Sequence, residues 1–157
     1  CPPHAASVRK LMDTGLQLGR RFRALKLWMI LRHFGAEGLR SALLEHIRLA
    51  QLFARWVDED QDFERLAPVP FSVVCFRARP RDVPLDVAAP DAVNDALMAA
   101  LNASGQIFLS HTKVNGMLAL RLAIGNLRTT ERHIARAWEL LRSHTARLRS
   151  ESTLNRL

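Results

Sequence analysis

Arg121 is the residue whose setting in the sequence is most suggestive of binding chemistry. It lies in the segment LALRLAIG, in which large aliphatic residues alternate with other types. Because successive side chains of a strand point to opposite faces, Arg121 should point away from the aliphatic face, between Ala119 and Ala123. Small neighbours leave room for a guanidinium, whose planar fork suits a carboxylate. An arginine that faces solvent on a half-exposed sheet fits equally, and the pattern alone favours that second interpretation.

The histidines and cysteines do not predict a metal site. The six histidines are scattered, and none forms a His-x-x-x-His pair or a cluster with cysteine. His111 and Thr112 lie at a predicted strand end beside a turn, where functional groups often occur, although the pattern fits an ordinary loop histidine. Cys1 and Cys75 are too few for a disulfide framework or a zinc site. Cys75, within SVVCF, is predicted to be a buried free thiol.

The segment LGRRF gives a weak phosphate-binding signal. Gly19 allows close approach of a backbone, and Arg20 and Arg21 add positive charge. No nucleophile elbow, phosphate-binding loop or dinucleotide fingerprint is present in the sequence. The residue types alone therefore predict a globular domain without an evident catalytic centre.

Composition narrows the class of protein. A chain of 157 residues suits one domain, and 48% hydrophobic with 24% charged residues is ordinary for a globular protein. A net charge of +8 suggests nucleic-acid binding as one hypothesis. However, the cations are spread along the chain, and no aromatic stripe interleaves them, so we do not favour it. The apolar runs are far shorter than the about 20 residues that span a membrane, and no secretory signal is recognisable. The two unspaced cysteines predict a reducing, cytoplasmic compartment.

Hydrophobic spacing predicts four helices. The first covers 21–34, with Phe22 and Trp28 on one face and Gly35 as its cap. A long helix over 36–58 follows, and its apolar stripe consists of Leu39, Leu43, Ile47, Ala50, Ala54 and Val57. A third helix should begin at Pro90 and end at Gly105. The fourth begins after a cap at Thr129 or Thr130 and turns polar near His144, which predicts a frayed tail over 149–157.

Strands are predicted between these helices. FERLAPVPFSVVCFRARP should form two short strands broken by prolines. QIFLS and MLALRLAIG should form two more, linked by HTKVNG, in which Asn115-Gly116 is a strong hairpin signal. The predicted fold class is α+β, with a mainly antiparallel sheet of about four strands and helices packed on one face.

Several long motifs resemble one enzyme family. LGRRFRALKLWMILRHFGAEGLR, HIRLAQLFARWVDEDQDFERLAPVPFSVVCFR and LNASGQIFLSHTKVNGMLALRLAIGNLRTTERHIARAWELL resemble, in the same order, segments of pyridoxal-phosphate-dependent group II decarboxylases of the aromatic-L-amino-acid type. The resemblance covers roughly residues 15–141. It implies the small C-terminal domain of a fold type I enzyme over 36–148, preceded by a remnant of the large cofactor-binding domain over 1–35.

The chain departs from the family pattern at the catalytic lysine. In these enzymes, the resemblance implies, pyridoxal phosphate forms a Schiff base with a lysine that follows a histidine. The lysines here are Lys10, Lys26 and Lys113, and none follows a histidine. We therefore expect no catalytic residue in this chain, no stable cofactor binding and no decarboxylase activity when it is alone.

The resemblance assigns roles to a few positions. Gly19 matches a glycine that approaches the active site across the dimer interface, where side-chain size tunes the substrate, and its match supports an aromatic amino acid. Arg121 matches a small-domain arginine toward the carboxylate end of the substrate, so its binding and solvent-facing interpretations become equally supported. Arg20, Arg21, Phe22 and Trp28 are candidates for interface or interdomain contacts.

We therefore predict a C-terminal fragment of an aromatic-amino-acid decarboxylase, whose partners are the missing large domain and, in the parent family, a second subunit. The alternatives are a self-associating or partner-binding interaction module, or one half of a split decarboxylase. The exposed apolar residues expected at Phe22 and Trp28 are compatible with all three.

Overall fold

The computed structural model describes residues 22–80 and 90–154, with the side chains of 151–154 outside this description. The chain divides into two compact units, residues 1–39 and 40–157. The helices are α1 (Arg23–Glu59), α2 (Pro90–Ala103) and α3 (Glu131–Leu154), and the strands are β1 (Phe63–Arg65), β2 (Val73–Ala78), β3 (Ser110–Val114) and β4 (Met117–Ala123). Among these described residues, no helix is long and apolar enough to cross a membrane.

The four strands form one antiparallel sheet in the order β1-β2-β4-β3. Val74 and Phe76 of β2 lie opposite Leu122 and Leu120 of β4, and all four side chains are buried. We call the side of the sheet that carries them the inner face. Along β2 and β4 these buried residues alternate with smaller or polar ones, which confirms the strand pattern predicted for LALRLAIG. The antiparallel sheet and its helices confirm the predicted α+β class.

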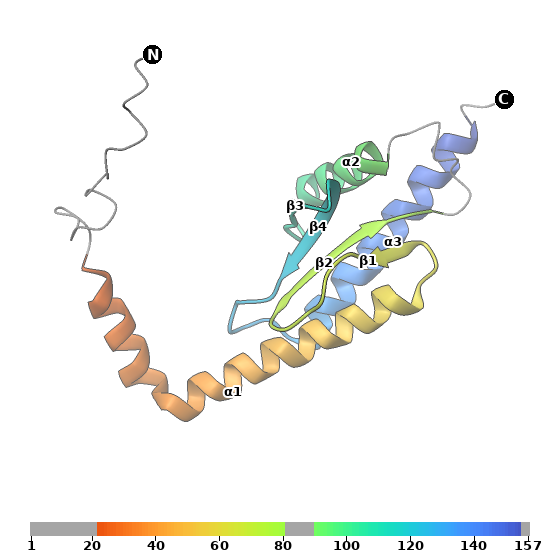
Figure 1. The fold of residues 1–157 in the computed structure, drawn as a ribbon. Helices are drawn as coiled ribbons and strands as arrows, with labels where there is room; N and C mark the ends of the chain where they lie inside the picture. Colours follow the sequence, from red (N-terminus) through yellow and green to blue (C-terminus); the bar gives the residue numbers. More distant parts are fainter. Residues whose placement is uncertain (1–21, 81–89, 155–157) are drawn as a thin grey trace, which may run out of the picture. The chain divides into compact units, whose positions relative to one another are not determined.

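The helices of the second unit cover the inner face, as Figure 1 shows for α1, α2 and α3. Aromatic rings form the centre of this core. Phe53 of α1 lies 5.3 Å from Phe76 and 5.7 Å from Trp138 of α3, ring centroid to centroid. Aromatic pairs at such separations stabilise a core beyond their buried area. Leucines complete it, contributed by all three helices: Leu49, Leu97, Leu101, Leu140 and Leu141.

Polar side chains of α2 fix this helix to the sheet. The amide of Asn94, fully buried, accepts the Ala78 N–H at 2.8 Å and donates to the Ala78 carbonyl at 2.9 Å. Asp91 accepts the Leu118 N–H at 3.0 Å at the start of β4. Ala78 is the last residue of β2, so Asn94 satisfies backbone groups that would otherwise be buried without partners. These bonds set the position of α2 along the strands.

An ion pair joins α1 to the start of α3. Arg48 bonds Glu45 at 2.8 Å within α1 and Glu131 of α3 at 3.2 Å; hydrogen bonds to these two carboxylates raise the pKa of Arg48, and the hydrogen bond from Arg48 lowers the pKa of Glu45. All three side chains are exposed, so the pairs contribute little stability. The buried His46 adds a contact nearby, with its Nε2 3.2 Å from the Asn126 carbonyl oxygen.

The predicted helices occur with two differences. The helices expected over 21–34 and 36–58 are confirmed as the two parts of α1, which meet in a kink at Gly35, and its φ of 65° has the positive sign predicted for a cap. Leu43, expected in the buried stripe, is exposed. The final helix continues to Leu154, where a frayed tail was expected from residue 149, and Arg149 bonds Asp62 across the fold.

The strand predicted at QIFLS was wrong. Strand β3 begins at Ser110 and runs through HTKV, which had been assigned to the linker. The two-residue turn Asn115-Gly116 (φ 51° and 80°) requires pairing at once, so Val114 lies opposite Met117. Residues 106–109 instead form a loop, in which the Asn102 side chain bonds both backbone groups of Leu109.

Replacement of Asn94 by leucine should destabilise the second unit by about 2–4 kcal/mol, because the Ala78 N–H and carbonyl would stay buried without partners. The free energy of unfolding from urea titration of the whole chain measures this. Asp95→Ala, at an exposed position next to it on α2, should change stability by less than about 0.5 kcal/mol. Equal effects of the two substitutions would show that the Asn94 bonds do not hold α2.

Candidate functional site

The candidate site lies on the outer face of the sheet, opposite the helix-covered inner face. Side chains of β2, β3 and β4 that alternate with the core residues point here, and most are half-buried or exposed: Val73, Cys75, Arg77, Ser110, Thr112, Ala119, Arg121 and Ala123. The buried side chains of the described helices gather with the inner-face residues in a separate, single core. The outer face is therefore the side of the sheet on which a further layer can pack.

Arg121 lies near the middle of this outer face. It is half-buried and lies opposite Cys75 of β2 and Ser110 of β3, in a row across three strands. The predicted orientation is confirmed, because the neighbouring Leu120 and Leu122 are buried on the inner face. Within the described part of the chain, Arg121 makes no hydrogen bond or ion pair. A half-buried guanidinium without a carboxylate is a ready anion-binding group.

Arg77, a second arginine on the same face, has a carboxylate partner. Arg77 donates to Glu64 at 2.9 and 3.1 Å and lies 3.1 Å from the Met117 sulfur. Its side chain is only 12% exposed. The described residues thus supply Arg77 with a carboxylate from β1 and supply none to Arg121, although the two arginines project from adjacent strands.

The other predicted site residues belong to the first unit. Gly19, Arg20 and Arg21 lie outside the described residues. Phe22 and Trp28 are 73% and 57% exposed, which confirms their expected exposure, while their interface role stays a prediction. The guanidinium of Arg32 lies 5.9 Å from the Trp28 ring centroid, a contact that is worth little at an exposed position.

The N-terminal half of α1 exposes more apolar surface than the sequence interpretation assigned to it. Eight large side chains between residues 22 and 34 are exposed: Phe22, Leu25, Leu27, Trp28, Met29, Ile30, Leu31 and Phe34. Five of them are consecutive in LWMIL, so they surround the helix and do not form one stripe. A helix that is apolar on all sides is normally buried inside a larger protein. Five consecutive apolar residues in LWMIL indicate a helix that is apolar all round, a signal missed when only Phe22 and Trp28 on one face were considered.

Two of the three lysines, Lys26 and Lys113, lie among the described residues. Lys26 and Lys113 are exposed, on α1 and on the edge strand β3, and neither lines a described cavity. Cys75, predicted to be buried, is half-buried on the outer face. The searched residues also contain no cluster of three or more metal-ligating side chains.

Comparison with known proteins gives the family. A family model described as the pyridoxal-dependent decarboxylase conserved domain matches residues 4–79. Tyrosine decarboxylase 2 of Arabidopsis thaliana is 42% identical over 90% of this chain, and tryptophan decarboxylase 2 of Oryza sativa is 43% identical over 92%. The chain belongs to the pyridoxal-dependent decarboxylase family. It matches only 26% and 29% of the length of these two relatives.

Solved structures agree with the sequence comparison. The tryptophan decarboxylase of Catharanthus roseus, in complex with L-tryptophan, superposes with a TM-score of 0.75 at 38% identity. The match covers 88% of this chain and 28% of that structure. This decarboxylase region thus has the fold of its relatives, while most of each relative has no counterpart here.

Replacement of Arg121 by threonine should change the free energy of unfolding by less than about 0.5 kcal/mol relative to the unsubstituted chain, because no described partner is lost and threonine suits a strand. Arg77→Thr is the matched control on the same face and should cost about 1 kcal/mol, because it breaks the bonds to Glu64. Urea titration of both variants measures this. A larger loss for Arg121→Thr than for Arg77→Thr would mean that Arg121 serves the fold.

Proposed function

We propose that this chain is the small-domain portion of an aromatic-amino-acid decarboxylase and acts only together with a larger, cofactor-binding portion. The observation that carries this proposal is the apolar N-terminal half of α1, exposed on all sides. Such a helix requires cover that the described residues do not provide. The part of the relatives that has no counterpart in this chain is the cover that fits best. This unmatched part favours the proposed function over an independent interaction module.

Arg121 is the residue proposed to serve the substrate. Its guanidinium is half-buried, has no carboxylate partner in the described part of the chain and projects from the outer face of the sheet. A substrate carboxylate would supply the missing charge and could accept two parallel N–H bonds. Arg121 would then orient the amino acid by its carboxylate end, and the reaction chemistry would belong to groups of the larger portion.

The residues before α1 are proposed to complete the site from the other side. Gly19 would approach the substrate side chain, where the absence of a Cβ leaves room for an aromatic ring. Arg20 and Arg21 would form ion pairs with the larger portion or with a second subunit, in a homodimer of the parent type. Pyridoxal phosphate would be held by the larger portion, in the cytoplasm, since the lysines described here do not fit it.

A chimera tests the proposed role of Arg121. This chain replaces the matched segment of the Arabidopsis tyrosine decarboxylase 2, and carbon dioxide release from tyrosine is measured. Arg121→Gln should lower kcat/KM roughly 10- to 100-fold, the worth of a lost hydrogen-bonded charge pair. Arg132→Gln, at an exposed position of α3, should leave it unchanged.

The isolated chain, assayed with pyridoxal phosphate, gives the baseline and should release no carbon dioxide. Turnover by this chain alone would contradict the requirement for a larger portion. An active chimera that tolerates Arg121→Gln as well as Arg132→Gln would remove Arg121 from the substrate site.

Association of the isolated chain tests the apolar helix. With no larger portion present, the exposed helix should drive self-association, because burial of its side chains removes apolar surface from water. Trp28→Glu should shift the sedimentation velocity distribution toward monomer. Phe108→Glu, at a residue that is 79% exposed in the second unit, is the matched control and should not. A wild-type chain that stays monomeric at all concentrations would argue against the helix as an interface.

A further inference from the structure

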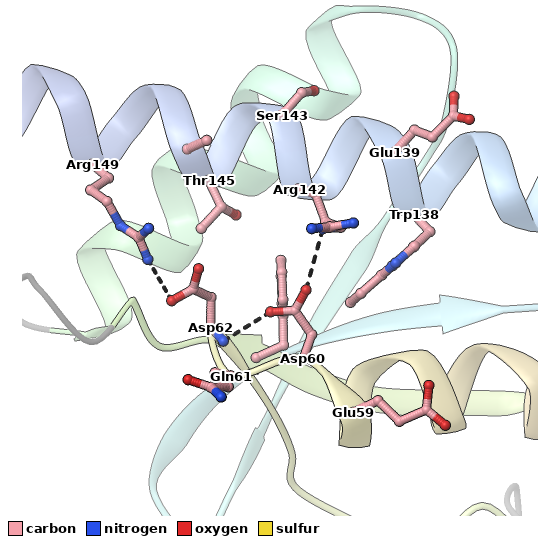
Figure 2. Close-up of a pocket in the computed structure, with 12 residues that line it drawn as sticks. Glu59, Asp60, Gln61, Asp62, Trp138, Glu139, Arg142, Ser143, Thr145 and Arg149 are labelled. Atoms are coloured by element: carbon pink, nitrogen blue, oxygen red, sulfur yellow. Dashed lines mark hydrogen bonds and ion pairs between the residues drawn. The ribbon is translucent and has the colours of Figure 1, made fainter.

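A cavity of about 690 Å³ lies between the end of α1 and the middle of α3. These helices cover the inner face of the sheet, whereas Arg121 is on the outer face. Figure 2 shows its two walls. Residues 59–62, which follow α1, form one wall, and α3 forms the other with Trp138, Arg142, Thr145 and Arg149.

Thr145 marks this cavity as a binding site. The residue is 2% exposed, and its hydroxyl oxygen has no hydrogen-bond partner among the described residues. In Figure 2 the hydroxyl points from α3 toward the segment that carries Asp60 and Asp62. A buried hydroxyl without a partner costs free energy. A ligand group that bonds it would recover that cost.

The charges of the walls leave a place for a cation at residues 59–62. The cavity is lined by Glu59, Asp60, Asp62 and Glu139, of which Asp60 pairs with Arg142 and Asp62 with Arg149 across it, while Glu139 pairs with Arg136. The C-terminal end of α1 lies here, with no basic residue in its last turn, so its free carbonyl groups add partial negative charge. These carbonyl groups add to the negative charge of Glu59, Asp60 and Asp62 on this wall, in a chain whose net charge is +8.

One ion pair leaves room for an exchange. Arg142 Nε lies 3.3 Å from Asp60 Oδ2, and the arginine side chain is 63% exposed while that of Asp60 is 18% exposed. An arginine so exposed gains little from the pair, so a ligand cation can take its place. Asp60 also accepts the Asp62 N–H at 2.9 Å, which holds the carboxylate in position for either partner.

The aromatic rings of the cavity suit an organic ligand. Trp138 is half-buried, and its ring centroid lies 5.0 Å from that of Phe63. Such a surface packs against hydrocarbon and attracts an adjacent ammonium group through its π electrons.

We propose that this cavity binds an organic primary ammonium ion. The ammonium displaces the Arg142 guanidinium from Asp60 and donates to the Thr145 hydroxyl, and the hydrocarbon part lies against Trp138. The site uses no residue of the outer face, so it stands independently of the proposed decarboxylase function. An arylalkyl monoamine and an aliphatic polyamine share this chemistry.

Isothermal titration calorimetry of the whole chain tests the site with phenethylamine, with spermidine and with 2-phenylethanol as the uncharged control. At least one amine should bind, and the alcohol should not. Stronger binding of phenethylamine would identify the monoamine as the source, and stronger binding of spermidine the polyamine. No heat from either amine up to about 10 mM, or equal binding of the alcohol, would overturn the proposal.

Substitutions with opposite expected effects make the test specific. Asp60→Asn keeps an oxygen for the Asp62 N–H and should weaken amine binding about tenfold, whereas Arg142→Gln removes the competitor and should tighten it about fivefold. Thr145→Val should weaken binding about fivefold without loss of stability, and Thr145→Ser should retain it. Unchanged affinity in both Asp60→Asn and Arg142→Gln would place the amine elsewhere and overturn the proposal.

Discussion

The structure depends on the burial of one face of its sheet by the described helices. The leucines of β4 meet Val74 and Phe76 of β2 and the helices behind them. Because strand side chains alternate, this burial forces Arg121 and Cys75 onto the opposite face. The position of this guanidinium on the outer face, away from the carboxylates of the described residues, is thus a direct consequence of how the core is made.

Local sequence signals predicted the elements that need no distant partner. The helix start at Pro90, the turn at Asn115-Gly116 and the cap at Gly35 follow from the backbone preferences of those residues. The start of β3 was misassigned because the apolar QIFLS has the composition of a strand. This segment does not pair as a strand, because the Asn102 side chain bonds the backbone N–H and carbonyl of Leu109 that strand pairing would use.

The site was predictable only in part, for a similar reason. Alternation gave the direction of Arg121, but its lack of a carboxylate became visible only beside Arg77, which bonds Glu64. That pairing depends on the register between β1 and β2, which no pattern within either strand specifies. Likewise, nothing in the sequence of α3 shows that the Thr145 hydroxyl has no partner among the described residues, because the wall that faces it comes from residues 59–62.

The apolar half of α1 also bears on the life of this polypeptide in a cell. Chaperones and proteases act on exposed hydrophobic segments, and the abundance of a protein follows the fraction of molecules that present them. A chain whose folded state always displays LWMIL presents such a segment even without unfolding. With the larger portion proposed above as the cover of that helix, the steady-state level of this chain would follow the supply of that portion, and an unassembled excess would be removed.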